Sequence, residues 1–303
     1  MLWGIDLGGT KIEGVVLKSA SDPTPLVRHR IATEGDQGYD HVISRIGLLV
    51  ENLKQEVGAV PDRIGMGTPG AIDPPTGLLK NSNSTALNGL PFHRDLEARL
   101  GYSFTLANDA NCFAVAETRM GIVPDKVPNA QFCFGIIMGT GVGGGIVIDG
   151  YSHNGLQGIG GEWGHSFLSV EGEDCYCGNH GCVETLISGP ALERYYRKLS
   201  NEQRSLREIV ERARAGGDPY ATKTMERLMH YFGRGLANLI NIMDPDAIVI
   251  GGGVGNIDEL YTEGIERVKS FAFNPRLDTP ILKPKLGDSA GVFGAAFLTA
   301  ERG

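Results

Sequence analysis

The sequence predicts an α/β protein of two lobes, in which one structural unit occurs twice with a cleft between the halves. Two Gly/Thr turns, residues 6–10 and 139–145, carry this prediction. Each turn lies between two apolar stretches that are typical of strands, and each opens one half of the chain. With 303 residues, each half is long enough to bury a core of its own.

The elements follow from apolar periodicity and from Gly and Pro positions. Strands are expected at residues 2–5, 12–17, 63–66, 102–107, 132–137, 146–148, 246–250 and 281–283. Helices are expected at 39–57, from 108 to about 121, from 190, from 206, at 219–243, from Gly253 to about 271, and at 290–301 after Ser289 as N-cap.

This order suggests a first lobe of residues 1–118 plus 289–303 and a larger second lobe of residues 119–288. The last helix is expected to return to the first lobe. The second lobe also holds a Gly- and Cys-rich loop at residues 162–184.

Composition and charge limit the classes of protein to which this chain can belong. Hydrophobic residues make up 41% of the chain and charged residues 21%, as in globular proteins. The net charge is −8 and no run is rich in Lys or Arg, which argues against a nucleic-acid or membrane surface. The N-terminus lacks the pattern of a secretion signal, and no apolar run is long enough to span a bilayer. We therefore expect a cytoplasmic protein, and the odd number of cysteines agrees.

The loop at 162–184 holds His165, Cys175, Cys177 and Cys182. Three thiolates and one imidazole form the ligand set of a structural, tetrahedral Zn²⁺ site. The spacing is not that of the common CxxC pair, so incidental cysteines on a surface loop stay an alternative. His180 lies in the same loop and is a possible rival ligand.

Two carboxylates, Glu162 and Glu184, flank this cluster. A metal that fixes the loop also fixes the direction of both side chains. The pair would then form a rigid polar wall for a ligand with several hydroxyl groups.

The two Gly/Thr turns could each present backbone N–H groups and a hydroxyl to a phosphate. The residues concerned are Gly8, Gly9, Thr10, Gly139, Thr140 and Gly141. The second turn matches GxGxxG only formally, because a strand and not a helix follows it, and no GK[ST] motif is present. Either turn alone could be a plain hairpin, but the matched pair favours a nucleotide triphosphate held from both lobes.

Three further glycines, Gly251, Gly252 and Gly253, end a strand before a helix. They would allow the flat, close approach of an adenosine. An ordinary strand-to-helix turn is the alternative.

Asp109 is the candidate general base. It follows a strand at the start of a helix, where an Asp could also serve only as N-cap. The neighbouring Asn108 and Asn111, with Asn83 upstream, suit the hydroxyl groups of a sugar. A carboxylate can orient such a hydroxyl and accept its proton late in phosphoryl transfer.

Phosphoryl transfer from ATP also requires Mg²⁺ on the β- and γ-phosphates. Asp6, at a strand end beside the first turn, could hold this ion through water, or could only stabilise its turn. Lys11 could meet a phosphate or be a solvated charge on a strand.

Taken together, these residues resemble the ROK family of repressors, open reading frames and kinases. The resemblance covers the whole chain. It rests on DLGGTK at 6–11, GTPG at 67–70, NDAN at 108–111, GTGVGGG at 139–145, GEWGH at 161–165, CYCGNHGCVE at 175–184 and DPDAIVIGGG at 244–253.

The resemblance implies an actin-like, ribonuclease-H-like pair of lobes that bind ATP and a hexose. It implies Asp109 as base and zinc bound by His165 and the three loop cysteines. The sugar ligands that it implies are Asn83, Asn108, Asp109, Glu162, His165 and Glu184.

Residues 80–92 and 184–189 look most similar to bacterial fructokinases, also called mannofructokinases. We therefore expect phosphorylation of fructose or mannose at the 6-hydroxyl. An N-acetylglucosamine or glucose kinase of the same family is the alternative, and a homodimer is the family expectation. A sugar-responsive repressor would require an additional basic helix-turn-helix, and we expect none because the chain starts at the first strand and is acidic.

Overall fold

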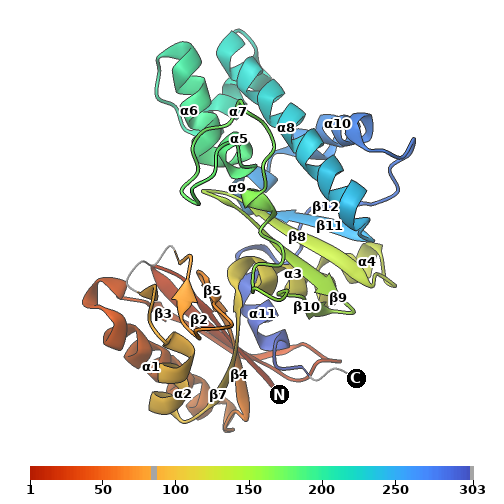
Figure 1. Ribbon diagram of the computed structural model, residues 1–303. Helices are drawn as coiled ribbons and strands as arrows, with labels where there is room; N and C mark the ends of the chain where they lie inside the picture. Colours follow the sequence, from red (N-terminus) through yellow and green to blue (C-terminus); the bar gives the residue numbers. More distant parts are fainter. Residues whose placement is uncertain (83–86, 301–303) are drawn as a thin grey trace. The chain divides into compact units, whose positions relative to one another are not determined.

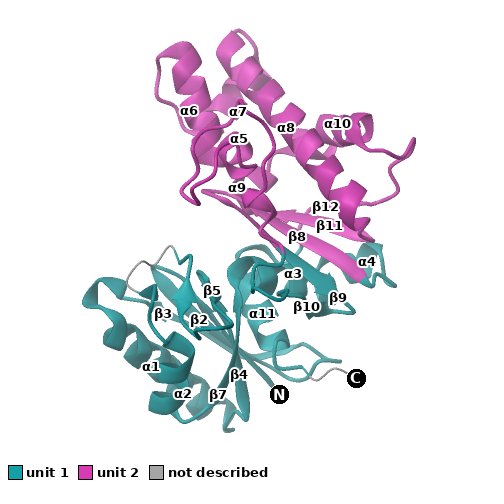
Figure 2. Ribbon diagram, in the orientation of Figure 1, with its two compact units in different colours: residues 1–131, 145–160, 285–303 teal, residues 132–144, 161–284 magenta. Residues whose placement is uncertain are grey.

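The computed structural model describes residues 1–82 and 87–300 (Figure 1). The chain divides into two compact units. Unit 1 comprises residues 1–131, 145–160 and 285–303, and unit 2 comprises residues 132–144 and 161–284 (Figure 2). The cleft predicted between the two halves stays a prediction.

Unit 1 contains β1 (Leu2–Leu7), β2 (Lys11–Leu17), β3 (Pro25–Ala32), β4 (Arg63–Thr68), β5 (Ala71–Ile72), β6 (Leu79–Lys80), β7 (Ser103–Asn108) and β10 (Tyr151–Ser152). Its helices are α1 (Tyr39–Val57), α2 (Phe92–Leu100), α3 (Asp109–Arg119), α4 (Ile122–Lys126) and α11 (Ala290–Phe297), with 3₁₀ turns at Gly35–Gln37 and Gly287–Ser289.

Unit 2 contains β8 (Phe132–Met138), β11 (Ala247–Gly251) and β12 (Ile281–Leu282), and β9 (Val142–Ile148) begins in it and ends in unit 1. Its helices are α5 (Glu184–Ile187), α6 (Gly189–Ser200), α7 (Leu206–Ala215), α8 (Pro219–Met243), α9 (Gly252–Gly255) and α10 (Glu263–Phe271), with 3₁₀ turns at Trp163–His165 and Asp258–Tyr261. All the predicted strands are thus present with shifted ends, and α8 has the predicted bounds.

The sheet of unit 1 has the order β3-β2-β1-β4-β7, with β1 at its centre. β1 pairs antiparallel with β2 and parallel with β4, and β4 pairs parallel with β7. Side chains alternate between the two faces of a strand. Trp3 and Ile5 therefore point to the face that α1 covers, where they join Ile43 and Ile46 in a buried core.

Helix α11 packs very closely against the other face of this sheet. A Cβ atom at Gly65 would lie 1.8 Å from the Ala295 carbonyl oxygen, and one at Gly4 would lie 2.4 Å from the Ala296 nitrogen. The helix therefore packs directly on the strand backbones, which only glycine permits at these positions. The predicted return of the last helix to the first half of the chain is confirmed.

Unit 2 repeats the strand order of unit 1. Its strands follow the order β9-β8-β11-β12, which corresponds to β2-β1-β4-β7. As in unit 1, the pairs after the central strand are parallel: β8 with β11, and β11 with β12. The predicted internal duplication is thus present in the topology of the two sheets.

Some details differ from the sequence predictions. The helix expected from Gly253 to about 271 is interrupted, since α9 ends at Gly255, a 3₁₀ turn follows, and α10 begins at Glu263. Ser289 precedes α11 but makes no capping bond; it instead accepts a hydrogen bond from Arg28. Residues 119–131 and 145–160 lie in unit 1, and Gly145 packs against the backbone of α3 at Ala110.

In the described part of the chain, none of the helices is both long enough and apolar enough to cross a bilayer.

Candidate active site

Two acidic side chains of unit 1 lie at the ends of β1 and β7, the two parallel strands that flank β4. Asp6 is the penultimate residue of β1, and Asp109 follows β7 directly as the first residue of α3. Between them lies β4, in which Gly67 pairs with Asp6 and Thr68 pairs with Asn108. Gly67 leaves room for the Asp6 carboxylate, because a Cβ atom there would lie 3.2 Å from Asp6 Oδ1.

The charge of Asp109 is among the causes that raise the pKa of Asp6. Burial, the charge of Asp109 and the charge of Glu13 together raise the pKa of Asp6 to about 6, against the opposing charges of Lys11 and Arg30. The Asp109 side chain reaches solvent, yet desolvation by the surrounding protein raises the pKa of its carboxyl. A raised pKa is typical of a carboxylate that accepts a proton from a substrate.

The helix cap separates the roles of Asn108 and Asp109. Asn108 is the N-cap of α3, and its Oδ1 accepts the N–H of Asn111 at 2.7 Å. Asp109 Oδ1 accepts the N–H of Ala110 at 2.8 Å. The alternative that Asp109 is only an N-cap is therefore wrong, since its neighbour performs that function.

A cavity of about 250 Å³ lies next to this helix start, within unit 1. Its walls include Thr68, Ile72, Asn108, Asn111 and Asn154, and Asn111 Nδ2 donates to Asn154 Oδ1 at 3.2 Å. The sequence prediction missed Asn154, and the only signal was its Gly-rich surroundings. The predicted sugar ligand Asn83 lies outside the described residues.

The first Gly/Thr turn joins β1 to β2. The N–H of Gly8 donates to the Lys11 carbonyl at 3.0 Å, and the Thr33 hydroxyl donates to the Gly8 carbonyl at 2.7 Å. Gly9 and Thr10 are exposed. Lys11 is half-buried, and its charge lowers the pKa of Asp6.

The second Gly/Thr turn joins β8 to β9 and borders a cavity of about 790 Å³ within unit 2. Gly139 and Thr140 lie on its wall with Gly253, so two of the glycine segments singled out from the sequence meet here. Helices α6 and α7 complete the wall of this cavity, and the sequence prediction missed their contribution. The helices provide Pro190, Leu206 and Val210, and the segment after β11 provides Val254 and Ile257.

Glu184 connects this turn to the Cys-rich loop. It is the first residue of α5, and its Oε2 accepts the N–H of Val142 at 2.9 Å. A Cβ atom at Gly141 would lie 2.6 Å from the same oxygen. The position of this carboxylate therefore depends on the absence of a side chain at Gly141.

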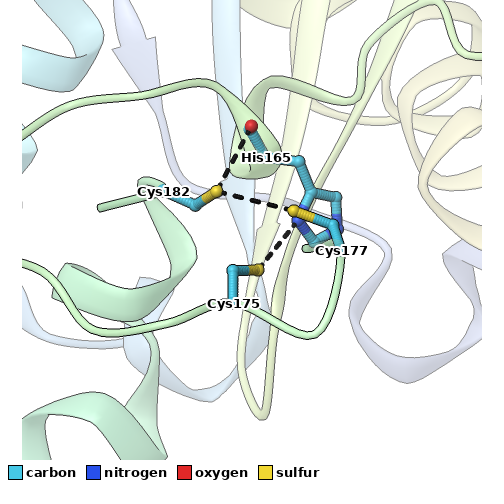
Figure 3. Close-up of side chains that lie close together, drawn as sticks. All are labelled: His165, Cys175, Cys177 and Cys182. Atoms are coloured by element: carbon cyan, nitrogen blue, oxygen red, sulfur yellow. Dashed lines mark hydrogen bonds between the residues drawn. The ribbon is translucent and has the colours of Figure 1, made fainter. Parts of the chain in front are cut away.

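The four predicted metal ligands converge on one point of unit 2 (Figure 3). Their ligand atoms all lie within 4.8 Å of one another. Cys175 Sγ is 3.5 Å from His165 Nδ1, and Cys177 Sγ is 3.7 Å from Cys182 Sγ. Tetrahedral zinc with sulfur at about 2.3 Å and nitrogen at about 2.0 Å requires ligand separations of about 3.5–3.8 Å, and these two separations match that range.

His180 is not part of this cluster. Its Nδ1 contacts Asp174 Oδ1 at 2.8 Å, and its Nε2 contacts the Val170 carbonyl at 3.2 Å. The rival ligand set with His180 is therefore wrong. Cys112 and Cys133 are buried outside the cluster.

Tyr176, between two of the cluster cysteines, is a residue of this region that the sequence prediction missed. Its hydroxyl lies 2.9 Å from His165 Nε2, and the two rings meet edge to face with centroids 5.0 Å apart. Desolvation, followed by the charges of Glu184 and Glu162, raises the pKa of Tyr176 to about 12.

Comparison with known proteins decides the family. The model of the ROK family matches residues 2–302, almost the whole chain. The chain belongs to the ROK family. N-acetyl-D-glucosamine kinases of Aliivibrio fischeri and Vibrio cholerae, which are each 35% identical to it, align with 99% of this chain and the whole of their own.

Solved structures of ROK proteins share the fold. A ROK hexokinase from Thermus thermophilus superposes with a TM-score of 0.87 at 32% identity, over 99% of this chain and 97% of its own. A ROK family glucokinase from Streptomyces griseus, in complex with glucose and AMPPNP, gives a TM-score of 0.76 at 27% identity, over 98% of both chains.

The sequence-based choice of fructokinase finds no support among these relatives. The curated relatives at 33–35% identity are described as N-acetyl-D-glucosamine kinases. The choice rested on residues 80–92 and 184–189, and the first of these segments includes positions 83–86, which lie outside the described residues. Short segments near a sugar site differ among related kinases, so they are a weaker guide than identity over the whole chain.

Proposed function

We propose that this ROK protein is an ATP-dependent sugar kinase that phosphorylates N-acetylglucosamine at its 6-hydroxyl. The substrate follows the full-length relatives described as N-acetyl-D-glucosamine kinases. The phosphoryl donor follows the glucokinase relative that was solved with AMPPNP. Fructose, the first expectation from the sequence, becomes the alternative substrate.

The observation that carries the proposal is the pair of Asp6 and Asp109 in unit 1. One carboxylate follows β7 at a helix start, and the other is half-buried at the end of β1 with a pKa of about 6. Phosphoryl transfer to a sugar requires one carboxylate for the attacking hydroxyl and another for Mg²⁺. The pair supplies both.

Asp109 would orient the 6-hydroxyl and accept its proton late in the transfer. The amide of Asn108, whose Oδ1 is engaged in the helix cap, would donate from Nδ2 to a sugar hydroxyl. Glu162, His165 and Glu184 would bind the remaining hydroxyls, as the family resemblance implies. Asn83 is carried over from the resemblance in the same role.

ATP would lie with its adenosine in the 790 Å³ cavity of unit 2, against Gly253 and the apolar residues of α6 and α7. The backbone N–H groups of the two Gly/Thr turns would meet its phosphates. Mg²⁺ supplies charge neutralisation at the β- and γ-phosphates when bound, and Asp6 would hold it through water.

The His165, Cys175, Cys177 and Cys182 cluster would hold a structural zinc ion. Without a cation, burial and the two neighbouring sulfurs raise the pKa of the Cys182 thiol to about 12, which a divalent ion would reverse. The ion would fix the loop that carries Glu162 and Glu184. A homodimer is also proposed, and light scattering after gel filtration would report a particle of twice the chain mass.

A panel of hexoses with Mg-ATP tests the proposal. N-acetylglucosamine, glucose, mannose and fructose are compared by ADP release, and phosphorus NMR identifies the phosphorylated carbon. The expected result is the highest kcat/KM with N-acetylglucosamine and phosphate at carbon 6. A higher kcat/KM with fructose would restore the fructokinase interpretation, and no ADP release with any sugar would refute the kinase proposal.

A further inference from the structure

The cavity of about 790 Å³ in unit 2 carries charged side chains on its wall, namely Glu193, Arg207, Glu211 and Arg214. Most of them are paired with one another or with a neighbour. Arg207 Nε lies 3.0 Å from Glu211 Oε1, and Arg214 donates hydrogen bonds of 2.6 and 2.7 Å to Glu259. Within the part of the chain that the structure describes, Glu193 differs from the others because it has no cationic partner.

A backbone contact fixes the direction of the Glu193 carboxylate. Its Oε1 accepts the N–H of Leu206, the first residue of α7, at 2.7 Å. A helix N-terminus has unpaired N–H groups and favours a negative charge, so this contact stabilises the carboxylate where it lies. Glu193 is half-buried, and no described residue donates a hydrogen bond to its Oε2. One oxygen is thus held by the protein, and the other is available to a molecule in the cavity.

A carboxylate oxygen can distinguish the two purine bases. It accepts hydrogen bonds and donates none. Adenine carries an exocyclic amino group, a donor, at the position where guanine carries the O6 carbonyl, an acceptor. An unpaired carboxylate oxygen therefore binds adenine and repels guanine at this position. The apolar side chains of the same wall, such as Leu206 and Val254, can pack against either flat ring and do not discriminate between them.

We infer that Glu193 is a specificity-determining residue that selects adenine nucleotides over guanine nucleotides. Its Oε2 accepts a hydrogen bond from the exocyclic amino group of the base, while the Leu206 N–H holds Oε1. This inference rests on the proposed function, in which the cavity binds the adenosine of ATP. It adds the side chain that rejects a second nucleoside triphosphate of the same size and charge.

Glu193→Gln keeps the shape of the side chain and replaces one acceptor by a donor. Because the Leu206 N–H needs an acceptor, the amide oxygen takes the place of Oε1 and the NH₂ group takes the place of Oε2. We expect wild type to prefer ATP to GTP about 100-fold in kcat/KM, and the variant to prefer it less than about tenfold. The change should lie in the nucleotide KM, while kcat and the sugar KM change less than about twofold. Glu211→Gln, which alters a carboxylate of the same wall that is paired with Arg207, is the matched control and should keep the wild-type preference.

Calorimetry with ADP and GDP makes the same comparison without phosphoryl transfer. An unchanged preference in Glu193→Gln would overturn the inference, because a carboxylate that only supports α7, or that binds the ribose, affects both nucleotides equally. Wild type that binds GDP as tightly as ADP, or that binds neither, would also overturn it, as would an equal loss of preference in Glu211→Gln. If wild type phosphorylates no sugar, the kinase proposal fails by itself, and the affinities for ADP and GDP still decide the role of Glu193.

Discussion

The two Gly/Thr turns occupy the same place in their sheets, yet they differ in chemistry. Two residues before the first glycine, β1 carries the carboxylate of Asp6, whereas β8 carries Ile137 at the corresponding position. The first turn is held by Thr33, and the second by the N–H of Gly189 and by Glu184. The two sheets thus share their strand order but carry different side chains at the corresponding turns.

This difference separates two tasks that a sugar kinase must combine. Unit 1 holds the acidic pair with perturbed pKa values, which suits proton and Mg²⁺ chemistry. Unit 2 holds the large cavity and the His/Cys cluster beside Glu184, which suits binding and orientation. Changes in unit 1 should therefore lower kcat, and changes in unit 2 should raise KM values.

The largest effect is expected from Asp109→Asn in unit 1. The amide preserves shape but cannot accept the proton, so kcat should fall about 10³-fold. Binding of the sugar, measured by calorimetry, should stay within about threefold of wild type because the amide still hydrogen-bonds. Asp125→Asn changes an exposed carboxylate of the same unit, paired with Lys285, and should leave kcat unchanged. A near-normal kcat in Asp109→Asn would exclude this residue as the base.

Asp6→Asn removes the negative charge from β1, so that this strand, like β8, is uncharged at this position. Weaker Mg²⁺ binding should lower kcat/KM for Mg-ATP about 10- to 100-fold, measured by titrating Mg²⁺ at fixed ATP. For wild type, protonation of Asp6 predicts that activity falls as the pH drops through about 6, the pKa of this carboxyl. A pH profile that stays flat from pH 8 to pH 5 would contradict this role.

The same variant should be more stable than wild type. The folded state raises the pKa of Asp6 from 3.8 to about 6, so it binds the proton more tightly than the unfolded state. The ionised carboxylate therefore lowers the free energy of unfolding above pH 6, by about 2–3 kcal/mol, and has no such effect below pH 4. Urea unfolding should show Asp6→Asn more stable at pH 8, with the difference vanishing toward pH 4.

Metal removal tests the role of unit 2 in binding the sugar. Cys177→Ser, or chelation of wild type, should raise the sugar KM about tenfold and change the ATP KM less than about twofold. The reason is that the loop carries Glu162 and leads into Glu184, whereas the large cavity is lined by other segments. Cys133→Ala alters a cysteine outside the cluster and should retain the metal. Protein purified without zinc, yet with a normal sugar KM, would contradict a structural metal.

Sequence patterns predicted the parts of this molecule that local chemistry determines. Strands and helices came from periodicity, and the convergence of His165 with three cysteines followed from ligand type within one short loop. Asp109 stood out because it follows a strand at a helix start. In each case, the prediction depends only on residues that are close in sequence.

The missed residues depend on packing between distant segments. Asn154 reaches Asn111 from a separate loop, and α7 reaches the Gly139 turn to form the large cavity. No pattern in the sequence reports such contacts, because they join residues tens of positions apart. The sequence also does not predict the contact of Tyr176 with His165, because the direction of a side chain between two cysteines is determined only by the folded loop.

Gly141→Ala should give the smallest effect, and it tests whether the second turn and the polar wall act together. The new Cβ would lie 2.6 Å from Glu184 Oε2, so the carboxylate must move and its bond with the Val142 N–H must weaken. We expect the sugar KM to rise about three- to tenfold at nearly constant kcat. Gly139→Ala adds the same methyl group two residues earlier, where the nearest atom is 3.9 Å away, and should leave the sugar KM unchanged. Equal effects of the two variants on the sugar KM would show that stiffening of the turn, and not displacement of Glu184, is responsible.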